Sequence, residues 1–201
     1  MIDVYKIIER TDAEGPYTRF CIWTQGCHRH CLGCWAKDTW NFGAGQKYSV
    51  DKLFGMIQDQ KDFIDGVTFL GGEPFEQVQE LALLSQKIKK LGLSVVAFSG
   101  YTFEELKLKN DKYIDKFLSY IDLLIDGGFE QDKFDLSRPW VGSSNQRYIF
   151  LTDRFNQEII NQFKNRVEIR INKYGKVEMN GMGDFKNLQE NFCLHLGADK
   201  V

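Results

Sequence analysis

Apolar residues recur at helical spacing in three stretches of the chain. Residues 49–60 carry apolar side chains three or four positions apart, and Ser49 at their start is a good N-cap. A longer apolar stripe over residues 76–92 ends at Gly92, and glycine commonly follows the last turn of a helix. Residues 102–107 open with the Thr-x-x-Glu pattern of a capping box. The pattern predicts a helix in each stretch.

Short runs of β-branched, aliphatic and aromatic residues lie between and after these helices. They predict strands at residues 17–25, 66–70, 93–98, 120–125 and 147–151. Closer to the C-terminus, residues 167–172 and 176–181 flank the sequence KYG and predict a β-hairpin. The alternation of strands and helices up to residue 125 predicts right-handed βαβ units. We therefore expect an α/β fold with a mainly parallel sheet and a short C-terminal β-hairpin.

Composition and charge narrow the class of protein. Of the 201 residues, 43% are hydrophobic and 27% are charged, as in ordinary globular proteins. The net charge of −2 gives no electrostatic reason to expect nucleic acid or an anionic membrane as a partner. The sequence has no signal-peptide core and no apolar run that could span a bilayer. We expect a cytoplasmic protein.

Three of the five cysteines crowd into the sequence CHRHCLGCW at residues 27–35. They are Cys27, Cys31 and Cys34, while Cys21 and Cys193 stand alone. Cysteines in this number and spacing argue against a disulfide scaffold and for metal or redox chemistry. The loop follows the strand predicted at 17–25, so it leaves the sheet at the edge where ligands of parallel sheets bind.

Three clustered thiols fit two kinds of metal site. A structural zinc ion needs four protein ligands, and His28 or His30 could supply the fourth. A [4Fe-4S] cluster held by three thiolates keeps one iron open, as catalytic metal sites do for substrate or cofactor. The spacing alone leaves both open, and the zinc alternative would make the chain a zinc-binding interaction module.

A second candidate site is the sequence FLGGEPFEQ at residues 69–77. Gly71 and Gly72 let the backbone approach another group closely, and Pro74 fixes the turn. Glu73 could accept hydrogen bonds from an ammonium group. Alone, this segment indicates a plain turn from a strand into a helix; beside the cysteine loop, it favours a ligand site.

The cysteine loop followed by GGEP resembles the radical S-adenosylmethionine (SAM) superfamily. Within it, the resemblance is strongest to the small activating enzymes of anaerobic ribonucleotide reductase and other glycyl-radical enzymes. The matching segments are GPYTR (15–19), WTQGC (23–27), GGEPFE (71–76), FSGYTFEEL (98–106), DLLIDGGF (122–129) and GSSNQR (142–147). The resemblance covers a core of about residues 15–150, and we expect one domain over 1–201 with a C-terminal extension at 151–201.

The resemblance implies a partial (β/α) barrel that holds one [4Fe-4S] cluster at its open end through Cys27, Cys31 and Cys34. An external flavodoxin- or ferredoxin-like reductant would supply one electron. Reductive cleavage of SAM would then give methionine and a 5′-deoxyadenosyl radical, which takes a hydrogen atom from a substrate. The sequence lacks the cysteines for a second cluster.

The resemblance also implies which residues contact SAM: Trp35, Gly71, Gly72, Glu73, Pro74, Ser99 and Asp126. The GGEP segment would cradle the methionine amino end, and Trp35 would lie near the adenine. The sequence leaves open whether Trp35 instead packs the cysteine loop, and whether Asp126 is only a turn residue. His28 and His30 are expected beside the cluster or in solvent, not as ligands.

The substrate stays open among several classes. A large glycyl-radical enzyme, a ribosomal peptide and a small molecule are all compatible with the motifs. We favour a polypeptide substrate because a short barrel leaves its top wide. The stretch 126–147 is the predicted docking rim, with Phe129 and Trp140 as contact residues, whereas Arg147 is expected to anchor the loop.

Overall fold

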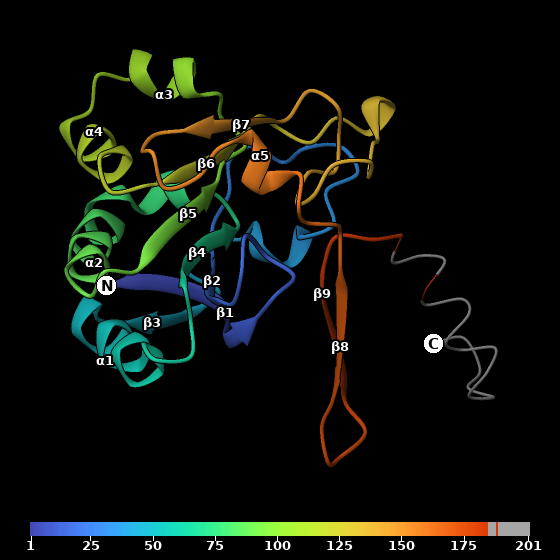
Figure 1. The fold of residues 1–201 in the computed structure, drawn as a ribbon, viewed down its shortest axis with the longest axis horizontal. Coiled ribbons are helices and arrows are strands. Elements are labelled where there is room, and N and C mark those ends of the chain that lie inside the picture. Colours follow the sequence, from blue (N-terminus) through green and yellow to red (C-terminus); the bar gives the residue numbers. More distant parts are fainter. Residues whose placement is uncertain (185–187, 189–201) are drawn as a thin grey trace.

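A computed structural model describes residues 1–184 and residue 188; Cys193 lies outside them. A seven-stranded sheet, in the order β3-β1-β2-β4-β5-β6-β7, forms the centre of the molecule (Figure 1). Its strands are β1 (Ile2–Thr11), β2 (Arg19–Thr24), β3 (Gln46–Tyr48), β4 (Gly66–Gly71), β5 (Ser94–Phe98), β6 (Leu123–Asp126) and β7 (Arg147–Phe150).

The four central strands β2, β4, β5 and β6 are parallel, and β1, β3 and β7 add antiparallel to the outside. In the described residues the sheet is open, with β3 and β7 at its edges. The α/β class and the parallel centre are therefore confirmed. Register pairs Thr24 with Gly71, and Phe98 with Ile125. The carboxyl ends of these strands consequently meet at one edge, where the cysteine loop and the GGEP segment begin.

The helices α1 and α3 begin at their predicted caps. They are α1 (Val50–Gln60), α2 (Val78–Lys90), α3 (Phe103–Leu108), α4 (Lys112–Leu118) and α5 (Gln157–Ile160), with 3-10 turns η1 (Lys37–Thr39), η2 (Pro74–Gln77) and η3 (Gln131–Lys133). Ser49 Oγ accepts from Lys52 N at 3.1 Å, and Thr102 and Glu105 form the predicted capping box. Figure 1 shows α1, α2 and α4 along one side of the sheet.

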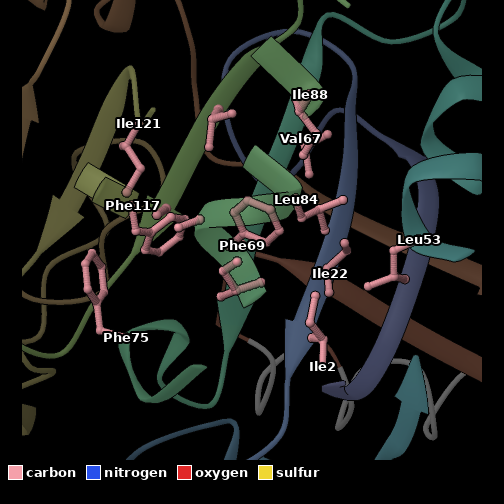
Figure 2. Packing of buried hydrophobic residues seen from close by; sticks show 14 of the residues in the cluster. Ile2, Ile22, Leu53, Val67, Phe69, Phe75, Leu84, Ile88, Phe117 and Ile121 are labelled. Atoms are coloured by element: carbon pink, nitrogen blue, oxygen red, sulfur yellow. The ribbon is translucent and has the colours of Figure 1, made fainter. Parts of the chain in front are cut away.

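The main hydrophobic core lies between these helices and the sheet (Figure 2). Leu53 of α1 and Leu84 of α2 are fully buried beside Ile22 of β2. Phe69 of β4 meets Phe117 of α4 edge to face, with ring centroids 5.8 Å apart. Burying each such side chain stabilises the fold by about 1.5–3 kcal/mol. The core therefore gives the loops at the carboxyl edge a rigid base.

The predicted C-terminal hairpin is confirmed as β8 (Val167–Ile171) and β9 (Val177–Gly181), paired antiparallel. It forms a separate two-stranded sheet that extends away from the end of the main one (Figure 1). Among the described residues, no helix is long and apolar enough to cross a membrane.

Trp140 departs from its predicted role as a docking residue. Its side chain is 1% exposed and belongs to a second core cluster with Val141 and Phe155. Its backbone is left-handed, with φ of +60°. The aromatic side chain therefore holds the stretch after β6 from inside, and the prediction that Trp140 contacts a partner is wrong.

Candidate functional site

A cavity of about 830 Å³ opens at the carboxyl edge of the sheet. It is lined by most of the predicted site residues: Cys27, Cys31, Cys34, Trp35, Gly71, Gly72, Glu73 and Ser99. The predicted residues that line the cavity thus come from segments up to 72 positions apart in the chain (27 to 99). Pro74 and Asp126 are not part of its lining.

The cysteine loop is fastened at its root by backbone hydrogen bonds. Gly26 N donates to Thr39 O at 2.7 Å, and Cys27 N donates to Trp40 O at 3.1 Å. Within the loop, Cys34 N donates to Cys31 O at 3.1 Å. The residues of η1 and Trp40 therefore hold the end of the loop against its beginning, which fixes the backbone on which the three thiols stand.

The three thiols differ in burial. Cys27 is 8% exposed, whereas Cys31 and Cys34 are half-buried. Burial raises the pKa of the Cys27 thiol, and backbone N–H groups of Arg29 and His30 that point at the sulfur oppose that rise. In the described part of the chain, no three His, Cys, Asp or Glu side chains converge on a single metal-ion position.

The two glycines of GGEP are required by close packing against the end of β2 and the root of the cysteine loop. Gly71 has φ of +101°, and a Cβ there would lie 2.7 Å from Trp23 Cα. A Cβ on Gly72 would lie 2.4 Å from Gly26 O. Glu73 N also donates to Gly26 O at 2.9 Å. The GGEP segment is thus bound directly to the root of the cysteine loop, one residue before Cys27.

Glu73 joins two neighbouring loops from a buried position. Its side chain is 1% exposed. Oε1 accepts from Phe75 N and from Ser99 Oγ, both at 3.0 Å, and Oε2 accepts from Gly100 N at 2.7 Å. Burial raises the pKa of this carboxyl to about 7, against the hydrogen bonds that favour the charged form. Three donors of the chain itself therefore occupy most of its accepting capacity.

Asp126 lies behind the cavity in a polar cluster. Its fully buried carboxylate accepts from Arg147 at 3.0 Å (Nε) and 2.6 Å, and from Phe103 N at 2.7 Å. Arg147 also pairs with Glu104. This arrangement confirms Arg147 as a loop anchor and gives Asp126 a role in holding the ends of β6 and β7 against α3.

The histidines of the cysteine loop contact other side chains. His28 Nδ1 lies 3.1 Å from a Glu76 carboxylate oxygen, and the His28 side chain is 67% exposed. His30 stacks on Trp40 with ring centroids 4.4 Å apart. Cys21 is buried in β2, as predicted.

Arg29 is a cavity residue that the motif analysis passed over. Its guanidinium lies 4.9 Å from the Tyr101 ring and 4.0 Å from a Glu105 oxygen. The signal was available, because a cation between two cysteines favours their thiolate forms. Phe129 also lines the cavity, in agreement with the predicted rim at 126–147.

Comparisons with known proteins point to one family. A family model described as a 4Fe-4S single cluster domain matches residues 13–149. The anaerobic ribonucleoside-triphosphate reductase-activating protein of Pasteurella multocida is 38% identical over 140 residues, which cover 66% of this chain and 87% of that protein. The proteins of the same name from Escherichia coli K12 and phage T4 are 32% and 30% identical, covering 66% and 69% of this chain and 88% of each relative.

Among solved structures, QueE from Escherichia coli aligns over 50% of this chain and 53% of its own, with 22% identity and a TM-score of 0.42. The evidence for the family comes from the sequences. Because the family model spans the cysteine loop, GGEP and β6, the matched region contains most of the residues that line the cavity. The chain belongs to the 4Fe-4S single cluster domain family that includes the anaerobic ribonucleoside-triphosphate reductase-activating proteins.

Proposed function

We propose that the protein is a radical SAM activase that generates a glycyl radical on an anaerobic ribonucleotide reductase. The observation that carries the proposal is the shared cavity, which is lined both by the three cysteines and by Gly71, Gly72 and Glu73 of the GGEP segment. The names of the curated relatives supply the substrate class. A polypeptide partner also agrees with the size of the cavity, about 830 Å³.

The donor set fits one [4Fe-4S] cluster. Three thiols, Cys27, Cys31 and Cys34, are the soft ligands that iron–sulfur clusters use, and they lie on one hydrogen-bonded loop. The N–H groups of Arg29 and His30 that point at Cys27 would stabilise its thiolate. When bound, such a cluster would supply the one electron that cleaves the sulfonium of SAM to methionine and a 5′-deoxyadenosyl radical, and this radical would take a hydrogen atom from the partner.

The remaining predicted residues divide into two groups in this proposal. Trp35, Gly71, Gly72 and Glu73 border the cavity and would contact SAM. Ser99 also borders the cavity, whereas Pro74 and Asp126 would act from behind it. Ser99 holds the Glu73 carboxylate, Pro74 opens the turn η2, and Asp126 holds Arg147. The electron would come from an external flavodoxin- or ferredoxin-like protein.

The test is anaerobic reconstitution with iron and sulfide, followed by reduction in the presence of SAM. We expect about four irons per chain, formation of 5′-deoxyadenosine and methionine without partner, and a glycyl-radical EPR signal once the cognate reductase is added. Zinc in place of iron, or iron without SAM cleavage, would refute the proposal. SAM cleavage without any radical on the reductase would leave the chemistry standing and reject the partner.

A further inference from the structure

The second strand of the hairpin forms part of the cavity wall, although the hairpin lies outside the family match at 13–149. Val177, Met179, Asn180 and Gly181 of β9 all line the cavity. In a strand, successive side chains point to opposite faces. Lining by Met179, Asn180 and Gly181 in succession therefore means that the cavity runs along the edge of β9.

The register determines which backbone groups that edge presents. Asn172 N donates to Lys176 O at 3.0 Å, and Met182 N donates to Arg166 O at 2.9 Å. Hydrogen-bonded pairs alternate along an antiparallel ladder, so the N–H and C=O groups of Val177, Met179 and Gly181 point outward. Gly181 confirms this direction, because its N–H donates outward to Glu14 Oε1 at 2.6 Å.

The outward groups of Val177 and Met179 make no backbone or side-chain hydrogen bond within the described residues. Val177 and Met179 thus form a short strand edge at the border of the cavity, and its donors and acceptors have no partner among residues 1–184. Such an edge is a template for another extended chain, whose backbone alone supplies donors and acceptors at matching spacing. A small metabolite lacks this repeat.

The edge is held in place by polar contacts at the base of the hairpin. Buried Glu14 accepts from Asn180 Nδ2 at 3.2 Å as well as from Gly181 N. Glu168 accepts from Thr11 Oγ1 at 2.8 Å and from Asp12 N at 2.8 Å. The hairpin is therefore fastened to the turn between β1 and β2.

One face of the hairpin is apolar and exposed. Ile169 pairs with Met179, and Ile171 pairs with Val177, so all four side chains share a face. Ile169, Ile171 and Val177 are 36%, 60% and 41% exposed. The opposite face carries Glu168 and Arg170. An added strand on β9 would extend the apolar face and bury part of it.

We propose that the outer edge of β9 binds an extended segment of the polypeptide partner as an added strand and guides it into the cavity that the three cysteines line. The inference rests on the proposed function for the identity of the partner. It adds to that function a docking element, the edge of β9, which lies outside the family match at residues 13–149.

The decisive comparison uses two proline variants. Met179→Pro removes an outward N–H from the edge at the cavity, and Ile169→Pro removes an outward N–H from the opposite edge of the same hairpin. Neither change removes a hydrogen bond between β8 and β9. We expect Met179→Pro to weaken binding of the cognate reductase about fivefold or more, as for loss of a backbone hydrogen bond, and Ile169→Pro to leave it unchanged.

Hydrogen exchange on the complete protein gives a second readout that needs no variant. Adding the reductase should protect the amides of Val177 and Met179 but not those of Ile169 and Ile171. Equal effects of the two proline variants, protection on β8 alone, or hairpin-dependent self-association without the reductase would overturn the proposal. Binding is measured without SAM, so failure of docking is distinct from failure of SAM cleavage, which the wild-type protein reports separately.

Discussion

The buried carboxyl of Glu73 makes protein stability depend on pH in a way that one substitution removes. Its pKa is raised from 4.5 to about 7 by burial, so the folded state favours the protonated acid. Because the pKa is raised on folding, protonated Glu73 contributes to the free energy of unfolding. This contribution is fully present below the pKa of the unfolded state and is lost as the pH rises through the pKa of the folded state. Wild-type protein should therefore lose stability through this group between about pH 4.5 and pH 8.

The magnitude follows from the shift. Each pKa unit corresponds to about 1.4 kcal/mol, and between pH 5 and pH 8 a shift of this size changes the free energy of unfolding by roughly 2–3 kcal/mol. Glu73→Gln cannot ionise, but its amide nitrogen cannot accept the hydrogen bond from Gly100 N. That loss costs about 1–3 kcal/mol at every pH. The variant should thus be less stable than wild type at pH 5. Between pH 5 and pH 8, its free energy of unfolding relative to wild type should rise by roughly 2–3 kcal/mol.

Urea unfolding of the reconstituted protein under anaerobic conditions at the two pH values measures this difference. Glu158→Gln, at an exposed position in the first turn of α5, is the matched control and should show no comparable change between the two pH values. A stability difference between wild type and Glu73→Gln that is the same at pH 5 and pH 8 would refute the reasoning.

Two further predictions concern the cysteine loop and the polar cluster behind the cavity. Substitution of Cys27, Cys31 or Cys34 by alanine, each alone, should abolish iron binding. The variants His28→Ala and His30→Ala should keep the full iron content, and loss of iron from either one would contradict the three-thiol assignment. Arg147→Leu leaves the carboxylate of Asp126 buried without its cation and should lower the free energy of unfolding by roughly 2 kcal/mol, a value reduced because Arg147 is itself solvent-accessible. Glu104→Gln, which spares that buried pair, should cost much less in the same urea titration, and equal losses would show that burial of Asp126 is not the cause.

Features that depend on a few neighbouring residues were predictable from the sequence. The N-cap at Ser49, the capping box at 102–105 and the C-terminal hairpin all appear where their signals lie. The meeting of the cysteine loop with GGEP was also predictable, because both follow parallel strands. Each of these inferences needs only the local pattern or the rule that the ends of parallel strands share an edge.

Features that depend on distant partners were missed. Strand β1 was not predicted, because register shifts between Val4 and Lys6 and between Ile8 and Thr11 break its alternation. The prediction that Trp140 is a rim residue was wrong because a second core cluster covers it. No sequence pattern shows that Ser99 and Gly100 donate hydrogen bonds to the Glu73 carboxylate, since those bonds depend on how β4 and β5 align.

The central claim is that a cluster held by three thiolates keeps one iron open for SAM. The most direct test is the EPR spectrum of the reconstituted, reduced protein, recorded before and after SAM is added. We predict a [4Fe-4S]⁺ signal whose shape changes on addition of SAM, because SAM would bind the open iron. A cluster signal that is identical with and without saturating SAM would contradict it.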